Sequence, residues 1–226
     1  MSTTTTPAGA MPATDTAGIQ RRTLRLLFLT QILGGIGVTI GMSVGALLAA
    51  RLAGTGVSGV VQSCAVVGAA LLAIPVSRLM AARGRRAGLV FAYAVGGAGG
   101  VLIVLAATTG SVALLFAGML IFGGGTTASL QSRFTAVDLA APARRGRDLS
   151  LIVWATTIGA VAAPNFAGLA GDAVRGFGLS PLAGPFVFST IAFALAAGVL
   201  LLLLRPDPLL TARRTAAAAA AANAPA

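Results

Sequence analysis

The sequence predicts an all-α membrane protein with six transmembrane helices, and three observations lead to this prediction. First, the chain of 226 residues is 57% hydrophobic and only 9% charged, with a mean hydropathy of +0.93. Soluble domains carry about 25% charged residues. Second, six apolar runs each approach the roughly 20 residues that a helix needs to cross a bilayer. Third, nearly all arginines fall in alternate gaps between these runs.

The segment before the first run is rich in Thr, Ala and Pro, and its one charge is Asp15. It lacks the basic start and apolar core of a secretory signal. We therefore expect residues 1–22 to form a disordered cytoplasmic tail and residues 23–205 to form the membrane bundle. The six runs cover approximately residues 26–50, 57–77, 87–107, 111–132, 149–170 and 184–204.

Arginine placement sets the predicted topology. Three arginines precede the first run, four lie in the second loop, four in the fourth loop, and three follow the sixth run. The first, third and fifth loops together hold only Arg51 and Arg175. Short arginine-rich loops stay in the cytoplasm. The sequence thus predicts a multi-pass protein of the inner (plasma) membrane with both termini cytoplasmic.

The region after the sixth run, residues 206–226, is predicted to be a flexible Ala/Pro-rich linker or tail. A helix does not easily continue through Pro206 and Pro208. The other interpretation is a helix along the membrane surface, but the Ala run has no apolar–basic alternation to hold it there.

Composition excludes several function classes. All 16 basic residues are arginine and all five acidic residues are aspartate, so the chain has no His and no Glu. These are usual zinc ligands and general bases, and only one cysteine is present, Cys64. We expect no metal, no cofactor and no enzyme activity. The net charge of +11 does not indicate nucleic-acid binding, because the arginines lie in gaps between apolar runs without interleaved aromatic residues.

Glycine-interrupted, polar-flanked helices recur in the first and fourth runs, which suggests two three-helix units related as an inverted repeat. Two interpretations stay open: the glycines mark a substrate path, or they only permit close helix packing. The same choice applies to the uncharged polar residues. The substrate-path candidates are Gln31, Thr39, Ser43, Thr126, Thr127 and Asn165, from a wider polar set that includes Ser129, Gln131 and Thr156.

Three motifs carry a family resemblance. The second loop contains Ser77 and Arg78, followed by Gly84-Arg85-Arg86. The fourth loop contains Asp138 and then Arg144-Arg145-Gly146-Arg147. The fifth run contains a small-residue motif formed by Gly159, Ala163, Pro164, Ala167 and Gly168.

Together these motifs resemble the N-terminal six-helix half of a transporter of the major facilitator superfamily (MFS), and the fifth-run motif resembles that of proton-linked drug antiporters. The resemblance implies efflux of small amphipathic organic molecules by alternating access. It also implies a cytoplasmic gate in the two loops, with Asp138 paired to a loop arginine. Ala81 stands where the family has an aspartate, and the helix-four arginine of its exporters would fall near Gly118 or Met119.

The expected partners are the lipid bilayer, a small-molecule substrate, and a second six-helix half or a second copy of the chain. The competing hypothesis is a non-transporting membrane scaffold or a degenerate half-transporter.

Overall fold

The structure is a computed structural model that describes residues 13–176 and 179–222. Its described part contains six helices long and apolar enough to cross a membrane, which confirms the predicted fold class. Five of them are α1 (Ala13–Ala53), α2 (Ser58–Arg83), α3 (Arg85–Thr109), α4 (Val112–Val137) and α5 (Arg145–Arg175). The sixth is α6 (Gly184–Leu203), which is followed by the shorter α7 (Pro208–Ala222). Short 3-10 turns lie at Thr55–Val57 and Pro142–Arg144.

The helices form two layers. In one layer α1 and α4 lie in contact at the centre, with α5 beside α1 and α2 beside α4. The second layer consists of α3, which packs on α4, and α6, which packs on α1. If α1 is exchanged with α4, α2 with α5 and α3 with α6, each main pair of packed helices maps onto another main pair or onto itself. The packing therefore has the form of the predicted repeat of two three-helix units.

The core between the two layers is aromatic. Tyr93 of α3, Phe122 of α4, and Phe186 and Phe193 of α6 are fully buried, and neighbouring rings have centroids 5.3–5.9 Å apart. Such tilted and edge-to-face ring pairs are favourable beyond the area that they bury. Glycines of α1 make room for these rings, because a Cβ at Gly41 would lie 2.3 Å from Phe122.

The structure differs from the expected tail at the start of the chain. Residues 13–22 continue α1, so the helix begins well before residue 23, whereas residues 1–12 lie outside the described part. Contacts within the protein explain the early start. Gln20 is 7% exposed and donates hydrogen bonds to the Ala136 carbonyl at 2.7 Å and to Asp148 Oδ2 at 2.8 Å.

The expected flexible linker is also different, because residues 208–222 form α7. The helix does break at Leu204–Asp207, as Pro206 and Pro208 predict. However, Pro208 is the first residue of α7, a position where a missing backbone N–H costs no helical hydrogen bond. The alanines that follow have the highest helix propensity of all residues. A proline pair can therefore end one helix and begin the next.

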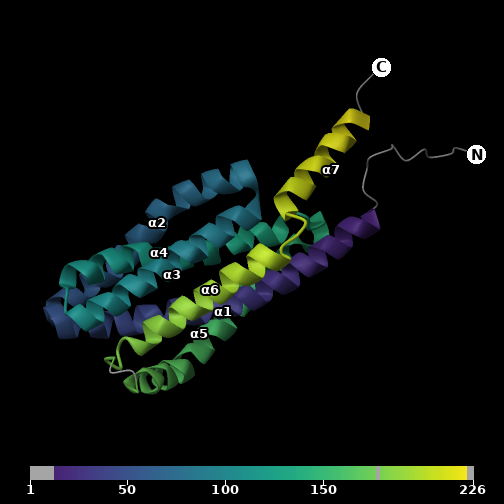
Figure 1. The fold of residues 1–226 in the computed structure, drawn as a ribbon. Helices are drawn as coiled ribbons and strands as arrows, with labels where there is room; N and C mark the ends of the chain where they lie inside the picture. Colours follow the sequence, from purple (N-terminus) through teal and green to yellow (C-terminus); the bar gives the residue numbers. More distant parts are fainter. Residues whose placement is uncertain (1–12, 177–178, 223–226) are drawn as a thin grey trace, which may run out of the picture.

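All four arginine-rich segments meet at one end of the bundle, where α1 begins and α7 projects (Figure 1). Three hydrogen-bond contacts connect them. Gln20 near the start of α1 binds Asp148, Arg85 of the second loop binds Asp138, and the Arg86 backbone N–H binds Asp207. We call this the arginine end of the bundle.

Candidate functional site

A buried polar cluster joins three helices inside the bundle. Gln31 of α1 is fully buried, and its side-chain amide donates to Ser129 Oγ of α4 and, at 2.9 Å, to Thr156 Oγ1 of α5. Its Oε1 has no hydrogen-bond partner among the described residues. Thr156 lies nine residues beyond Arg147, which is about 14 Å at 1.5 Å per residue. The cluster is thus close to the middle of an apolar layer of roughly 30 Å.

The other predicted path residues do not join this cluster. Thr127 is buried and donates to the Ala69 carbonyl of α2 at 2.8 Å, so it contributes to helix packing. Thr39 and Thr126 are half-buried and Ser43 is exposed, all on the central helices α1 and α4. Because α3 and α6 cover the other side of these two helices, the exposed atoms belong to the open face of the four-helix layer. Asn165 is exposed on α5.

The glycines of the first and fourth runs contact other helices closely. A Cβ at Gly123 would lie 2.4 Å from the Ala65 carbonyl oxygen of α2, and one at Gly124 would lie 2.6 Å from the Ala92 carbonyl oxygen of α3. A Cβ at Gly37 would lie 2.9 Å from the Phe193 ring. These positions support the packing interpretation of the glycines.

The fifth-run motif lies at the contact between α5 and α1. A Cβ at Gly159 would be 2.7 Å from the Ile32 carbonyl oxygen, so the two helix backbones approach closely there. Ala163 is buried beside Ile36 and Ile40 of α1, whereas Pro164 and Gly168 are exposed and Ala167 is half-buried. One edge of the motif therefore packs within the bundle and the other edge faces outward.

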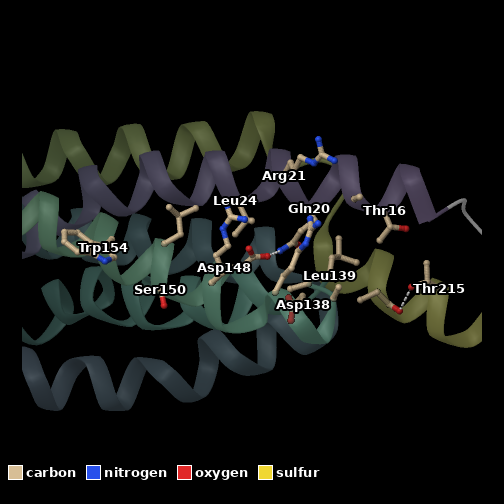
Figure 2. A pocket seen from close by; sticks show the side chains of 17 residues that line it. Thr16, Gln20, Arg21, Leu24, Asp138, Leu139, Asp148, Ser150, Trp154 and Thr215 are labelled. Atoms are coloured by element: carbon tan, nitrogen blue, oxygen red, sulfur yellow. Dashed lines mark hydrogen bonds between the residues drawn. The ribbon is translucent and has the colours of Figure 1, made fainter.

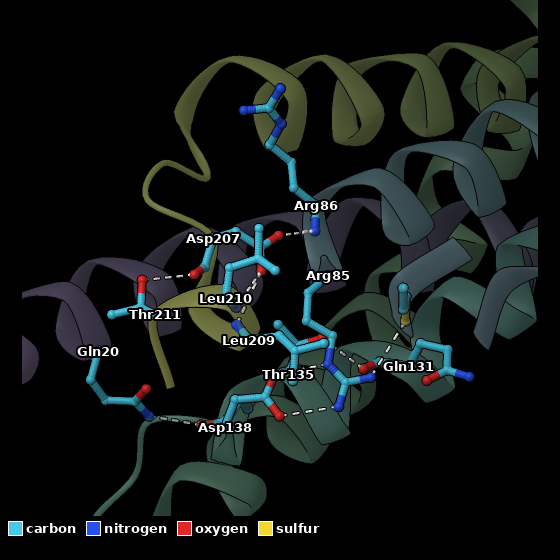
Figure 3. A network of polar contacts seen from close by, with 12 residues as sticks. Gln20, Arg85, Arg86, Gln131, Thr135, Asp138, Asp207, Leu209, Leu210 and Thr211 are labelled. Carbon is cyan, nitrogen blue, oxygen red and sulfur yellow. Dashed lines mark hydrogen bonds and ion pairs between the residues drawn. The ribbon is translucent and has the colours of Figure 1, made fainter. Parts of the chain in front are cut away.

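At the arginine end, Arg85 and Asp138 form a two-pronged ion pair (Figure 3). Arg85 Nε lies 2.8 Å from Asp138 Oδ2, and the Nη2 donor lies 3.1 Å from Oδ1. The pair connects the start of α3 to the end of α4, as the resemblance implied for Asp138. The two side chains of this pair are only 18% and 11% exposed. It is therefore stronger than a solvent-exposed surface pair.

A second carboxylate at the same end was not recognised from the sequence. Asp207 accepts hydrogen bonds from the backbone N–H groups of Arg86 at 2.8 Å, Leu209 at 3.0 Å and Leu210 at 3.3 Å (Figure 3). It therefore caps α7 and also contacts the start of α3. The signal was present, because an aspartate directly before a proline and a helix-forming run is a helix-start pattern.

The remaining gate-loop residues occupy several places at this end. Ser77 Oγ accepts a hydrogen bond from Gln131 Nε2 at 3.0 Å, which joins α2 to α4. Gly84 adopts a φ of +92° between α2 and α3. Arg78 and Arg145 are exposed. Arg144 and Arg147 are also exposed, and they line a cavity.

This cavity has a volume of about 1130 Å³ and lies between α1, the α4–α5 connection, the start of α5 and α7 (Figure 2). Its charged lining includes Arg21, Arg144, Arg147 and the buried Asp148. Its apolar lining includes Leu24, Leu151 and Trp154. We call it the basic cavity.

Comparison with known proteins identifies relatives of the chain. It is 40% identical over 192 residues to two proteins of Bacillus subtilis, the uncharacterized MFS-type transporters YdeG and YddS. The aligned region is 84% of this chain, but the chain spans only about 45% of the length of each of these relatives. No protein-family model and no solved structure matches it. By sequence identity the chain is a homologue of MFS-type transporters, and its six membrane-length helices fit one half of a transporter of the major facilitator superfamily.

Proposed function

We propose that this chain is a six-helix half of an MFS secondary transporter that exports small amphipathic organic molecules by alternating access. The observation that carries this proposal is the 40% identity to MFS-type transporters over most of the chain. The export direction and the use of antiport rest on the likeness of the fifth-run motif to that of drug antiporters. The arginine end is proposed to be cytoplasmic, since arginine-rich short loops are retained on that side.

The Gln31 cluster is the proposed contact point for the substrate. Ligands of membrane transporters bind near the bilayer midplane, at the interface between structural repeats. Gln31 and Ser129 lie on α1 and α4, the two equivalent helices at the centre of the bundle. The unpartnered Oε1 of Gln31 can accept a hydrogen bond from a substrate hydroxyl or amine. Leu29 and Leu130, both exposed on these helices, supply apolar surface for the rest of an amphipathic molecule.

The open face of the four-helix layer is the proposed contact for a second six-helix half or a second copy of the chain. An amide that faces hydrocarbon without a partner costs several kcal/mol, and Asn165 is exposed on α5. A partner bundle or a water-lined path over this face would hydrate or pair the amide. MFS halves pack as two such bundles about an axis along the membrane normal.

One observation favours the competing function, a membrane scaffold without transport activity. Gly118 and Met119 occupy the region where the family's exporters carry an arginine, and both are buried. A Cβ at Gly118 would already lie 2.7 Å from Ile103, so no arginine fits there. A transporter built from this chain must therefore obtain its proton-coupling group elsewhere.

Efflux of a fluorescent hydrophobic cation from energised cells distinguishes the two functions. The cells should express the complete gene product, or this chain with its partner, in an assembly verified by size. Transport predicts lower dye accumulation than in empty-vector cells, and Gln31→Ala should abolish the difference. Thr109→Ala is the control, because Thr109 is exposed at the end of α3 and its hydroxyl donates to the Leu105 carbonyl of the same helix, away from the Gln31 cluster and the gate loops. Unchanged accumulation of a panel of dyes by the verified assembly would favour the scaffold.

A further inference from the structure

The basic cavity contains three arginines whose guanidinium groups are not committed to other partners. Arg21, Arg144 and Arg147 are exposed and line the cavity, and none of their side chains makes an ion pair or a hydrogen bond within the described part of the chain. The nearby Asp138 does not neutralise them, because Arg85 already pairs with it. Uncommitted guanidinium groups that line one cavity favour an anion with several oxygen atoms, above all a phosphate.

The deep side of the cavity contains an unpaired hydrogen-bond acceptor, so a ligand there should carry a hydrogen-bond donor. Both N–H bonds of the Gln20 amide are used, one by the Ala136 carbonyl and one by Asp148 Oδ2. These two contacts fix the amide orientation, since a flipped amide would place oxygen against oxygen. The Gln20 Oε1 atom is then an acceptor without a donor, on a side chain that is only 7% exposed. A bare phosphate leaves this acceptor unsatisfied and is repelled by the carboxylate beside it.

The third part of the cavity is apolar and leads toward the membrane. Leu24, Leu151 and Trp154 line it, and Trp154 is 66% exposed on the outer surface of α5. Trp154 lies seven residues beyond Arg147, about 10 Å along the helix axis. Tryptophan at this depth is typical of the boundary between headgroups and hydrocarbon. Hydrocarbon chains that leave the cavity along Trp154 would enter the bilayer directly.

We propose that the basic cavity binds an anionic phospholipid with a hydroxylated headgroup, of the phosphatidylglycerol type. The lipid phosphate binds Arg21, Arg144 and Arg147. The glycerol hydroxyls donate to Gln20 Oε1 and Asp148, and the acyl chains lie along Leu151 and Trp154. The cavity volume of about 1130 Å³ slightly exceeds the range of roughly 300–1,000 Å³ for small-molecule sites, which suits a headgroup with the first part of its chains. This site is separate from the Gln31 cluster and does not depend on transport.

Trp154 is the single tryptophan of the chain, so its fluorescence reports on this site alone. The test reconstitutes the purified full-length chain in phosphatidylcholine vesicles and adds lipids with brominated acyl chains, which quench tryptophan on contact. Brominated phosphatidylglycerol should be preferred over brominated phosphatidylcholine at equal mole fraction by at least about fivefold, the factor that corresponds to about 1 kcal/mol, the contribution of a single arginine near the surface.

Two matched double variants separate the cavity from general surface charge. Arg144→Gln with Arg147→Gln should remove most of the preference. Arg78→Gln with Arg83→Gln changes the charge equally at the same end, at exposed residues outside the cavity lining, and should leave the preference nearly intact. Gln20→Met removes the proposed acceptor for the glycerol hydroxyls. It should lower the preference for brominated phosphatidylglycerol over brominated phosphatidic acid, whose headgroup has no glycerol hydroxyls.

Three results would overturn the proposal. Equal quenching by the two lipids would show that no selective site exists. An equal loss in both double variants would assign the preference to surface charge. Abolition of the preference by soluble glycerol 3-phosphate would assign the cavity to a water-soluble ligand. Loss of dye efflux has no bearing on any of these readouts, so the lipid site and the transport function fail or succeed independently.

Discussion

Gly84 and Asp207 are in direct contact at the arginine end, so closely that a Cβ on Gly84 would lie 2.5 Å from Asp207 Oδ2. Gly84 also has a φ of +92°, in the region that only glycine adopts readily. The Gly-Arg-Arg turn between α2 and α3 is thus shaped to receive a carboxylate. The resembled family supplies an aspartate within its own loop, where this chain has Ala81. Here Asp207, from the segment after α6, occupies the turn.

Gly84→Ala should therefore destabilise the protein through two effects, the strained φ and the collision with Asp207. Gly54→Ala is the matched control, because Gly54 has a similar φ of +87° but nothing within 4 Å of the added Cβ. We expect about 1–2 kcal/mol for the control from backbone strain alone and about 1–3 kcal/mol more for Gly84→Ala. Thermal unfolding in detergent measures the difference. Equal losses in the two variants would show that Asp207 does not fill the turn.

Asp207→Ala should release α7 from the bundle. The substitution removes the acceptor for three backbone N–H groups, and loss of an aspartate helix cap typically costs about 0.5–2 kcal/mol. Trypsin cleavage at the exposed Arg213 and Arg214 of α7 measures the release, and we expect it to accelerate severalfold. Asp172→Ala serves as the control, since Asp172 is exposed and, among the residues that the structure describes, pairs only with Arg175 at the end of α5. Unchanged cleavage in Asp207→Ala would contradict the capping role.

The coupling between Arg85 and Asp138 should be measurable in a double-mutant cycle with Arg85→Gln and Asp138→Asn. Two charge-assisted hydrogen bonds between side chains that are 18% and 11% exposed should give a coupling of about 1.5–3 kcal/mol. The same cycle on Arg175 and Asp172, which are about two-thirds exposed, should give about 0.5 kcal/mol or less. Denaturant unfolding of the four proteins of each cycle provides the numbers. Similar small couplings in both cycles would mean that the Arg85 pair is effectively solvated.

Hydrophobic run length and arginine placement were sufficient to predict the six helices and the single arginine end. Both signals depend on the energy of placing residues in a bilayer, which the sequence reports directly. The pairing of Asp138 with a loop arginine was also foreseen, because the resemblance placed both loops on one face. These are properties of single segments or of which side a loop occupies.

Contacts between helices were predicted less well, because they depend on how each helix is rotated about its axis. Thr126 and Thr127 stay predicted path residues, but the α4 residue that Gln31 contacts is the neighbouring Ser129. Thr127 instead faces Ala69 of α2. A shift of two residues along α4 turns a side chain by about 200°, and composition alone does not fix that angle. The helix α7 was missed for another reason: two prolines were interpreted as a break, and the cap formed by Asp207 was overlooked.

The two equivalent edges of the bundle use the same glycine contact, which gives the final prediction. A Cβ on Gly68 of α2 would lie 1.8 Å from the Leu120 carbonyl oxygen of α4, and one on Gly159 of α5 would lie 2.7 Å from the Ile32 carbonyl oxygen of α1. Since α2 and α4 correspond to α5 and α1 in the repeat, both crossings rely on direct contact between backbones.

Gly68→Ala and Gly159→Ala should each force two helices apart, at a cost of about 1–3 kcal/mol, with the larger loss at Gly68 where the overlap is greater. Gly59→Ala on α2 is the control, because its added Cβ would meet nothing within 4 Å. Alanine has the higher helix propensity, so this control should be neutral or slightly stabilising. Unfolding in SDS titrations measures all three variants. A loss at only one of the two crossings would mean that the repeats do not share this packing, whereas losses at both with none in the control tie the fold's symmetry to two glycines, one in each half of the bundle.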